Sequence, residues 1–188
     1  MKTVQPTRHL AARERRERGI GVLQIALCLV VAASIAAGTM MKYSEFRKNQ
    51  EIAATIEDMR IIKDQVETLF VHRQDFTGLD NEFLIANGNL PERLIDGDVI
   101  HGQFNFNQSV GNYRVRGNGT RFQLNVMFVS DNACPALATS RIASSAATIY
   151  IWDHGGQRTF TSKPFLSDVQ DICFNDRPAT HIRFVYEE

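Results

Sequence analysis

The stretch that decides the fold is IGVLQIALCLVVAASIAAGTMM, residues 20–41, which contains no charged side chain. A helix of this length rises about 33 Å, enough to cross a hydrocarbon core of about 30 Å. Arginines stand directly before the stretch, and Lys42 and Glu45 stand directly after it. The sequence therefore predicts a transmembrane helix over residues 20–41.

The residues before this helix carry a strong positive charge. Six basic and two acidic side chains fall in residues 1–19, although the whole chain has 21 of each sign. A basic excess on one side of a span places that side in the cytoplasm, so we expect residues 1–19 to be a cytoplasmic basic leader. A secretory signal peptide fits less well, because the apolar run is longer than a usual signal core and its nearest cleavage candidate, Ala36-Ala37-Gly38, is followed by more apolar residues.

The helical pattern continues past the membrane edge. Apolar residues recur at steps of three and four between Ile52 and Phe70, with charged residues on the other side. No proline interrupts this pattern. We expect one helix from about residue 20 to about residue 73, with an amphipathic continuation over residues 42–76 that packs on a globular body.

Residues 77–188 are expected to form this body, a globular head. A long loop over residues 77–112, with at most short elements, precedes the strands. The fold class is α+β, in which the long N-terminal helix packs on an antiparallel sheet of about four or five strands with helices on one side. The expected elements are two hairpins turning at residues 117–119 and 153–156, two short helices within residues 134–146 and 164–174, and a last strand at residues 181–186.

The chain has three cysteines. Cys28 lies in the apolar run, which leaves Cys134 and Cys173 as the only plausible pair. If the head lies outside the cytoplasm we expect a disulfide between them, because such compartments allow disulfides to persist. The loop it closes, of about 40 residues, would contribute roughly 4 kcal/mol by the chain-entropy argument.

Motifs that would indicate an enzyme are absent from the sequence. It contains no GxSxG, no HExxH and no phosphate-binding glycine loop, and no histidine stands at ligand spacing from the two cysteines of the head. No basic stripe interleaved with aromatic residues occurs outside the leader, so nucleic acid is not an expected partner. We predict a protein that is not an enzyme, with no catalytic residues, no cofactor and no metal site.

A family resemblance is carried by the leader junction Glu17-Arg18-Gly19, the uncharged helix that begins at the next residue, and the paired cysteines. This combination resembles the type IV pilins, and the type IVb branch in particular. Three further stretches are similar to the bundle-forming and conjugative pilins of that branch. They are QDFTGLDNEFLIANGNLPERL (residues 74–94), like the loop after the long helix, and FQLNVMFVSDNACPALAT with DICFN (residues 122–139 and 171–175), like the disulfide-bounded region.

The resemblance implies a route of processing and assembly. A prepilin peptidase would cleave between Gly19 and Ile20, and the new amine would commonly be methylated. An inner-membrane assembly platform and an ATPase would then move the subunit from the bilayer into an extracellular pilus, or fimbrium, used in adhesion, aggregation or conjugation. The partners implied are other pilin subunits, these assembly proteins, and the lipid bilayer before assembly.

One position departs from the family pattern. The fifth residue after the cut is usually Glu, and here it is Gln24. A carboxylate there would pair with the terminal amine of a neighbouring subunit, whereas an amide cannot neutralise that charge. The departure leaves open a minor pilin or a secretion pseudopilin, although Gln24 can also be read as a polar residue tolerated near the membrane interface. From another class, a signal-anchored extracytoplasmic binding domain that does not polymerise remains an alternative.

Overall fold

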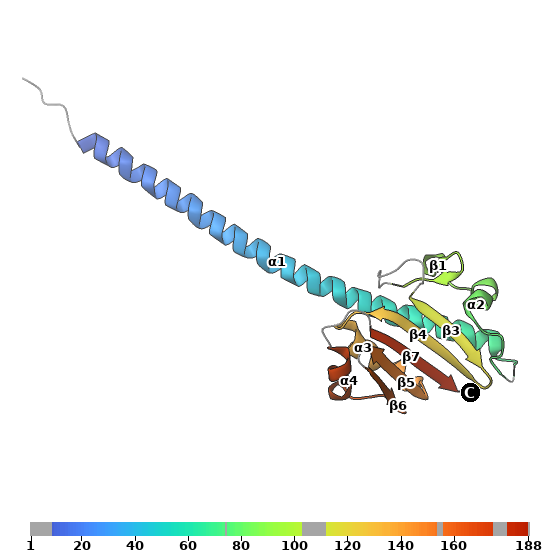
Figure 1. The fold of residues 1–188 in the computed structure, drawn as a ribbon. Helices are drawn as coiled ribbons and strands as arrows, with labels where there is room; N and C mark the ends of the chain where they lie inside the picture. The colour runs from blue at the N-terminus through green and yellow to red at the C-terminus, as the bar shows by residue number, and fades with distance from the viewer. Residues whose placement is uncertain (1–8, 74, 103–111, 154–155, 175–179, 188) are drawn as a thin grey trace, which may run out of the picture. The chain divides into compact units, whose positions relative to one another are not determined.

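The computed structural model of the chain is shown in Figure 1. The chain divides into two compact units, residues 1–47 and residues 48–188. The residues that the structure describes are 9–73, 75–102, 112–153, 156–174 and 180–187.

Helix α1 spans His9–Phe70 and supplies residues to both units. Its end lies within three residues of the predicted one, but the predicted start near residue 20 is wrong. The reason is composition: residues 9–19 are mostly Ala, Leu, Arg and Glu, which favour a helix, and the last proline before them is Pro6. Nothing in the local sequence therefore stops the helix at the end of the leader.

The described residues of the second unit form a seven-stranded antiparallel sheet with the strand order β1-β2-β3-β4-β7-β5-β6. The prediction of four or five strands missed β1 and β2, which have two residues each and are too short to show a period. The strands are β1 (Ile95–Asp96), β2 (Val99–Ile100), β3 (Tyr113–Asn118), β4 (Arg121–Val129), β5 (Thr148–Asp153), β6 (Gly156–Phe160) and β7 (Thr180–Glu187).

The first predicted hairpin forms, but its turn is displaced. β3 and β4 are joined by Gly119 and Thr120, so Gly117 and Asn118 belong to the strand rather than to the turn. Gly119 has a φ of 57°, which glycine adopts at little cost. The second predicted hairpin is confirmed by the pairing of β5 with β6, although its turn at residues 154–155 lies outside the described residues.

The short helices are α2 (Asn81–Asn87), α3 (Ala133–Ala138) and α4 (Leu166–Cys173), with 3-10 turns η1 (Glu92–Leu94) and η2 (Ala143–Ser145). The helix predicted over residues 134–146 is wrong in length, because it breaks after Ala138. Hydroxyl groups lie at the break: the side chain of Thr139 donates to the Pro135 carbonyl at 2.7 Å, and the Ser140 Oγ accepts from the Ala143 amide at 3.3 Å. Such bonds compete with a regular helix.

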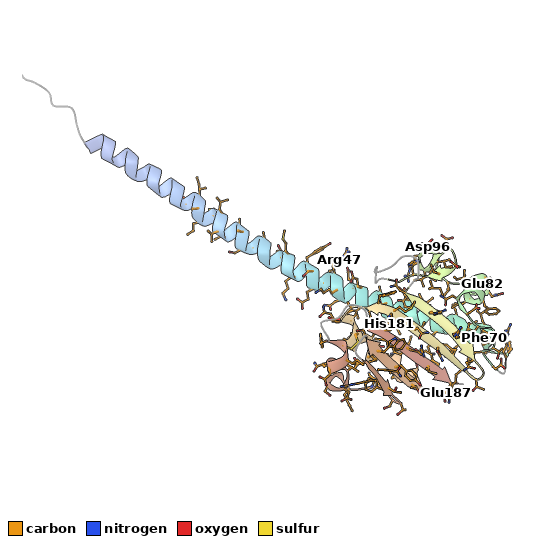
Figure 2. The ribbon with its side chains drawn as sticks, in the orientation of Figure 1. Arg47, Phe70, Glu82, Asp96, His181 and Glu187 are labelled. Atoms are coloured by element: carbon orange, nitrogen blue, oxygen red, sulfur yellow. A yellow bond between two sulfur atoms is a disulfide. The ribbon has the colours of Figure 1, made fainter. Side chains whose placement is uncertain are left out.

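The core of the second unit lies between one face of the sheet and the helices. The apolar stripe predicted for the second half of α1 is confirmed, since Met59, Ile62, Val66 and Phe70 are buried. In Figure 1 this part of α1 crosses one face of the sheet. The stripe ends in a row of rings that leads into the sheet and begins at Phe70, labelled in Figure 2. The centroid distances are 5.3 Å for Phe70–Phe76, 4.9 Å for Phe76–Phe122 and 4.8 Å for Phe122–Tyr186.

Candidate assembly site

The first unit presents apolar side chains to its surroundings along the predicted membrane segment. Ile25, Leu27 and Val30 are each about two-thirds exposed, and Val31 and Ile35 are at least half exposed. By length and composition alone, the helix over Gln24–Phe70 is long and apolar enough to cross a membrane. A helix with apolar side chains all round is not stable in water, so it needs lipid or other helices around it.

The hydroxyl groups of this segment are satisfied within the helix. The Ser34 Oγ donates to the Val30 carbonyl at 2.8 Å, and the Thr39 Oγ1 donates to the Ala36 carbonyl at 2.9 Å. An unsatisfied donor costs several kcal/mol in hydrocarbon, so these two bonds suit a helix that lies in lipid or among apolar helices. The amide side chain of Gln24 is exposed.

The predicted cleavage junction lies inside α1. Gly19 and Ile20 have helical backbone, and their side-chain surroundings are outside the described residues. The structure therefore adds one fact to the predicted site: residues 9–19 of the leader and the apolar segment form a continuous helix in the uncut chain. Cleavage after Gly19 remains a prediction.

The two cysteines of the head join two helices. Cys134 of α3 and Cys173, the last residue of α4, form a disulfide with a Cα–Cα distance of 5.6 Å, and both are fully buried. This distance falls in the usual range for disulfides. Cys28 is free and exposed on the apolar segment. The bond therefore ties α4 to α3 and is shielded from solvent.

A partly buried ion pair that the sequence did not predict holds residues 92–94 against α1. Asp58 lies on α1 with no exposed surface, and its Oδ1 is 2.6 Å from Nη1 of Arg93, which belongs to η1 and is about half exposed (49%). Asp58 stands four residues before Ile62, on the apolar stripe. The sequence did contain a signal for this pair, since Asp58 is a carboxylate on the apolar stripe. A buried charge requires a partner, so an ion pair could have been expected there.

The phenol of Tyr113 lies in the same region. Its hydroxyl donates to the Thr55 carbonyl over 3.5 Å, a long hydrogen bond. Burial, together with the nearby charge of Asp58, raises the pKa of Tyr113 far above its usual range. The phenol is therefore neutral at any physiological pH and acts here as a packing group.

Asn81, the first residue of α2, attaches this helix to the backbone of β3. Its amide Nδ2 donates to the Tyr113 carbonyl at 2.9 Å, and its Oδ1 accepts from the Val115 amide at 2.7 Å. One side chain thus makes the two hydrogen bonds that a neighbouring strand would make. Asp80 caps α2 by accepting from the Phe83 amide at 2.8 Å. The first part of the predicted long loop is therefore closely held.

In the part of the chain that the structure describes, no group of His, Cys, Asp and Glu side chains is arranged to hold a metal ion. Near Asp58, the described polar contacts join segments of the chain: Arg93 of η1 pairs with Asp58 of α1, and the Tyr113 hydroxyl donates to the Thr55 carbonyl of α1.

The comparisons with known proteins agree with the resemblance found in the sequence. Residues 45–185 match the family model described as Bundlin. The chain is 22% identical over 144 residues to the major structural subunit of bundle-forming pilus of Escherichia coli O127:H6 (strain E2348/69 / EPEC), over 71% of this chain and 69% of that protein. The protein of the same name from Escherichia coli O111:H- gives the same values.

One solved structure is also similar. It is the crystal structure of TcpA, a type IV pilin from Vibrio cholerae El Tor biotype, with 9% sequence identity and a TM-score of 0.47, over 73% of this chain and 99% of that one. The family match spans well over half of the chain and includes the second half of α1, the sheet and both cysteines of the head. The chain therefore belongs to the Bundlin family of bundle-forming type IV pilins, whose members are structural subunits and not enzymes.

Proposed function

We propose that this chain is made as a type IVb prepilin, is cut between Gly19 and Ile20, and then polymerises through residues 20–41 into an extracellular pilus. Membership of a pilin family supports polymerisation with other pilin subunits. The single observation that carries the proposal is the exposed apolar surface of α1. A helix with this surface can leave the bilayer only by burying itself against similar helices.

Removal of the leader would allow the helix to move outward from the membrane. The six basic side chains of residues 1–19 hold that end in the cytoplasm, and moving them through hydrocarbon would be very costly. Cutting after Gly19 removes this barrier, so the shortened helix can move outward. A prepilin peptidase, an inner-membrane assembly platform and an ATPase are the partners that this route requires.

We favour the role of a major pilus subunit for this chain. Both Escherichia coli relatives are named major structural subunits. A fibre of such subunits would act in adhesion, aggregation or conjugation. The minor pilin and the secretion pseudopilin are the second candidates, and Gln24 is the observation that favours them, because it cannot neutralise a neighbour's terminal amine.

The composition of sheared fibres tests this proposal. Fibres are sheared from cells that express the chain, and the subunits are quantified by mass spectrometry with isotope-labelled peptides from the head. A major subunit must supply most of the fibre mass. A small constant number of copies per fibre would support a minor pilin. Detection in membranes and never in fibres would support the signal-anchored domain and contradict the proposal.

A further inference from the structure

The outer end of the apolar helix carries a group of aromatic and basic side chains. Tyr43 is 64% exposed and Phe46 is 58% exposed, and the cations Lys42 and Arg47 stand beside them. Arg47 is labelled in Figure 2. All four residues belong to the first unit, directly after the uncharged stretch.

The four side chains share one side of the helix. At 3.6 residues per turn, Lys42, Tyr43, Phe46 and Arg47 fall within an arc of about 140°. Glu45 and Lys48 fall outside this arc, and the Lys42 Nζ lies 3.1 Å from Glu45 Oε2 across its edge. The side thus has two aromatic rings between two cations, the combination that settles at the boundary of lipid headgroups and hydrocarbon.

The distribution of charge gives this side a particular role after processing. In the uncut chain the basic leader anchors one end of the helix in the cytoplasm. Once residues 1–19 are removed, no charged side chain remains before Lys42, and the new terminal amine is the only charge at that end. The side chains that fix the depth of the mature helix then lie at its outer end.

We propose that Lys42, Tyr43, Phe46 and Arg47 form an interfacial collar that binds the anionic headgroup layer on the head side of the membrane and sets the depth of the mature helix. The inference deepens the proposed function and depends on it for the removal of the leader. The rings suit the headgroup boundary and the cations attract anionic lipid. The collar holds the subunit at one depth until assembly withdraws it.

The position of the collar can be measured directly. A Phe46→Trp variant is prepared in a Trp152→Phe chain, so that only one tryptophan reports, and is placed in vesicles of phosphatidylethanolamine and phosphatidylglycerol. The emission should be blue-shifted, and lipids brominated near the headgroup should quench it more than lipids brominated near the chain ends. Quenching that is strongest from the chain ends, or absent from both, would overturn the proposal. This readout applies to the cut and the uncut chain.

The anchoring role is tested with a nitroxide on Cys28, the free cysteine of the described residues. The collar variant combines Lys42→Gln, Tyr43→Ser, Phe46→Ser and Arg47→Gln. Electron paramagnetic resonance should show the label shifted toward the head-side surface by about 5 Å, one helical turn. Glu45→Gln with Lys48→Gln, from the same segment but outside the arc, is the matched control and should leave the depth unchanged.

The outcomes separate the two proposals. A chain whose intact mass still includes Met1 in cells with prepilin peptidase contradicts the proposed function, whatever the label shows. A correctly cut chain whose label depth is the same in the collar variant and the wild type overturns the collar. The melting temperature of the head is measured for each collar variant and for the chain into which it was introduced, and the two should agree, because no collar residue belongs to the second unit.

Discussion

Gly117 shows how a single residue depends on a contact far away in the sequence. A Cβ added at Gly117 would lie 1.8 Å from the carbonyl oxygen of Phe76, whereas a Cβ at Gly156 would meet nothing within 4 Å. Gly117→Ala must push apart β3 and the backbone after α1. We expect it to lower the free energy of unfolding by about 3 kcal/mol.

The measurement is urea unfolding of the variant and of Gly156→Ala, the matched control, which should stay within about 0.5 kcal/mol of the wild type. Equal stability of the two variants would show that Phe76 does not approach β3 as closely as described.

The Asp58–Arg93 pair predicts an asymmetry between its two partners. Arg93→Met leaves a fully buried carboxylate without this cation, which should cost about 3 kcal/mol. Asp58→Asn leaves a half-exposed guanidinium that water can reach, and it should cost about 1 kcal/mol. The double variant should cost less than the sum of the single variants, because the removed charges belong to one interaction.

Thermal unfolding of the three variants gives the comparison. Arg60→Met is the control, since Arg60 is exposed and pairs with the exposed Glu57 and Asp64; such surface pairs add little to stability. A larger loss for Asp58→Asn than for Arg93→Met would be incompatible with a carboxylate that needs its cation.

Gln24 predicts a gain of function. If the amide limits docking of subunits, Gln24→Glu should raise the mass of fibre that can be sheared from a fixed number of cells, because a carboxylate can pair with a neighbour's terminal amine in a low-dielectric site. Gln24→Ala should not raise it, and it serves as the control for polarity at this position. An unchanged or lower yield with glutamate would mean that the position does not limit assembly.

At the scale of elements, the disulfide is the feature that ties α3 to α4. Replacing both Cys134 and Cys173 with Ser should lower the stability of the head by about 3 to 4 kcal/mol, because the reduced unfolded chain regains the freedom of a loop of 39 residues in sequence separation. Cys28→Ser is the control and should leave the head unchanged. An unaltered melting temperature for the double variant would show that the bond does not stabilise this region.

The sequence was sufficient for the elements whose signals are local. The stripe from Met59 to Phe70 repeats at helical spacing, and the strands alternate, so the long helix, the two hairpins and the α+β class followed from pattern. The start of α1 at His9 was not predicted from the sequence. The predicted start near residue 20 was based on the charge of the leader and on the expected cleavage, and neither of these ends a helix. The turn at Gly119 was displaced because two glycines compete there, and the choice depends on Phe76.

Other features depend on contacts that no local pattern records. Phe128 has a φ of 61°, uncommon for a residue with a bulky side chain, and it lies where the pairing of β4 with β7 shifts between Val126 and Val129. The partner of Asp58 is 35 positions away in the sequence, so spacing could not identify Arg93. In the candidate assembly site, the absence of charged residues was enough to predict the apolar helix. The hydrogen bonds of the Ser34 and Thr39 hydroxyl groups could be seen only in the structure.

At the scale of the whole molecule, the proposed function requires one chain to be stable in lipid, in water and in a fibre. The first unit has exposed apolar side chains, as a segment in lipid would, and the second unit buries its own core and carries the disulfide. In the proposal, the leader keeps the chain in the membrane, since its charges oppose outward movement. The account therefore depends most on whether the leader is removed.

The most direct measurement is the intact mass of the chain from cells with and without prepilin peptidase. The account predicts that the chain from cells with the enzyme begins at Ile20 and is recovered from fibres, and that the chain from cells without it keeps Met1 and stays in membranes. Gly19→Leu should behave like the enzyme-free case, and Gly21→Ala, a neighbouring glycine with open space around it, like the wild type. Full-length chain in both cells, or full-length chain in fibres, would contradict the account.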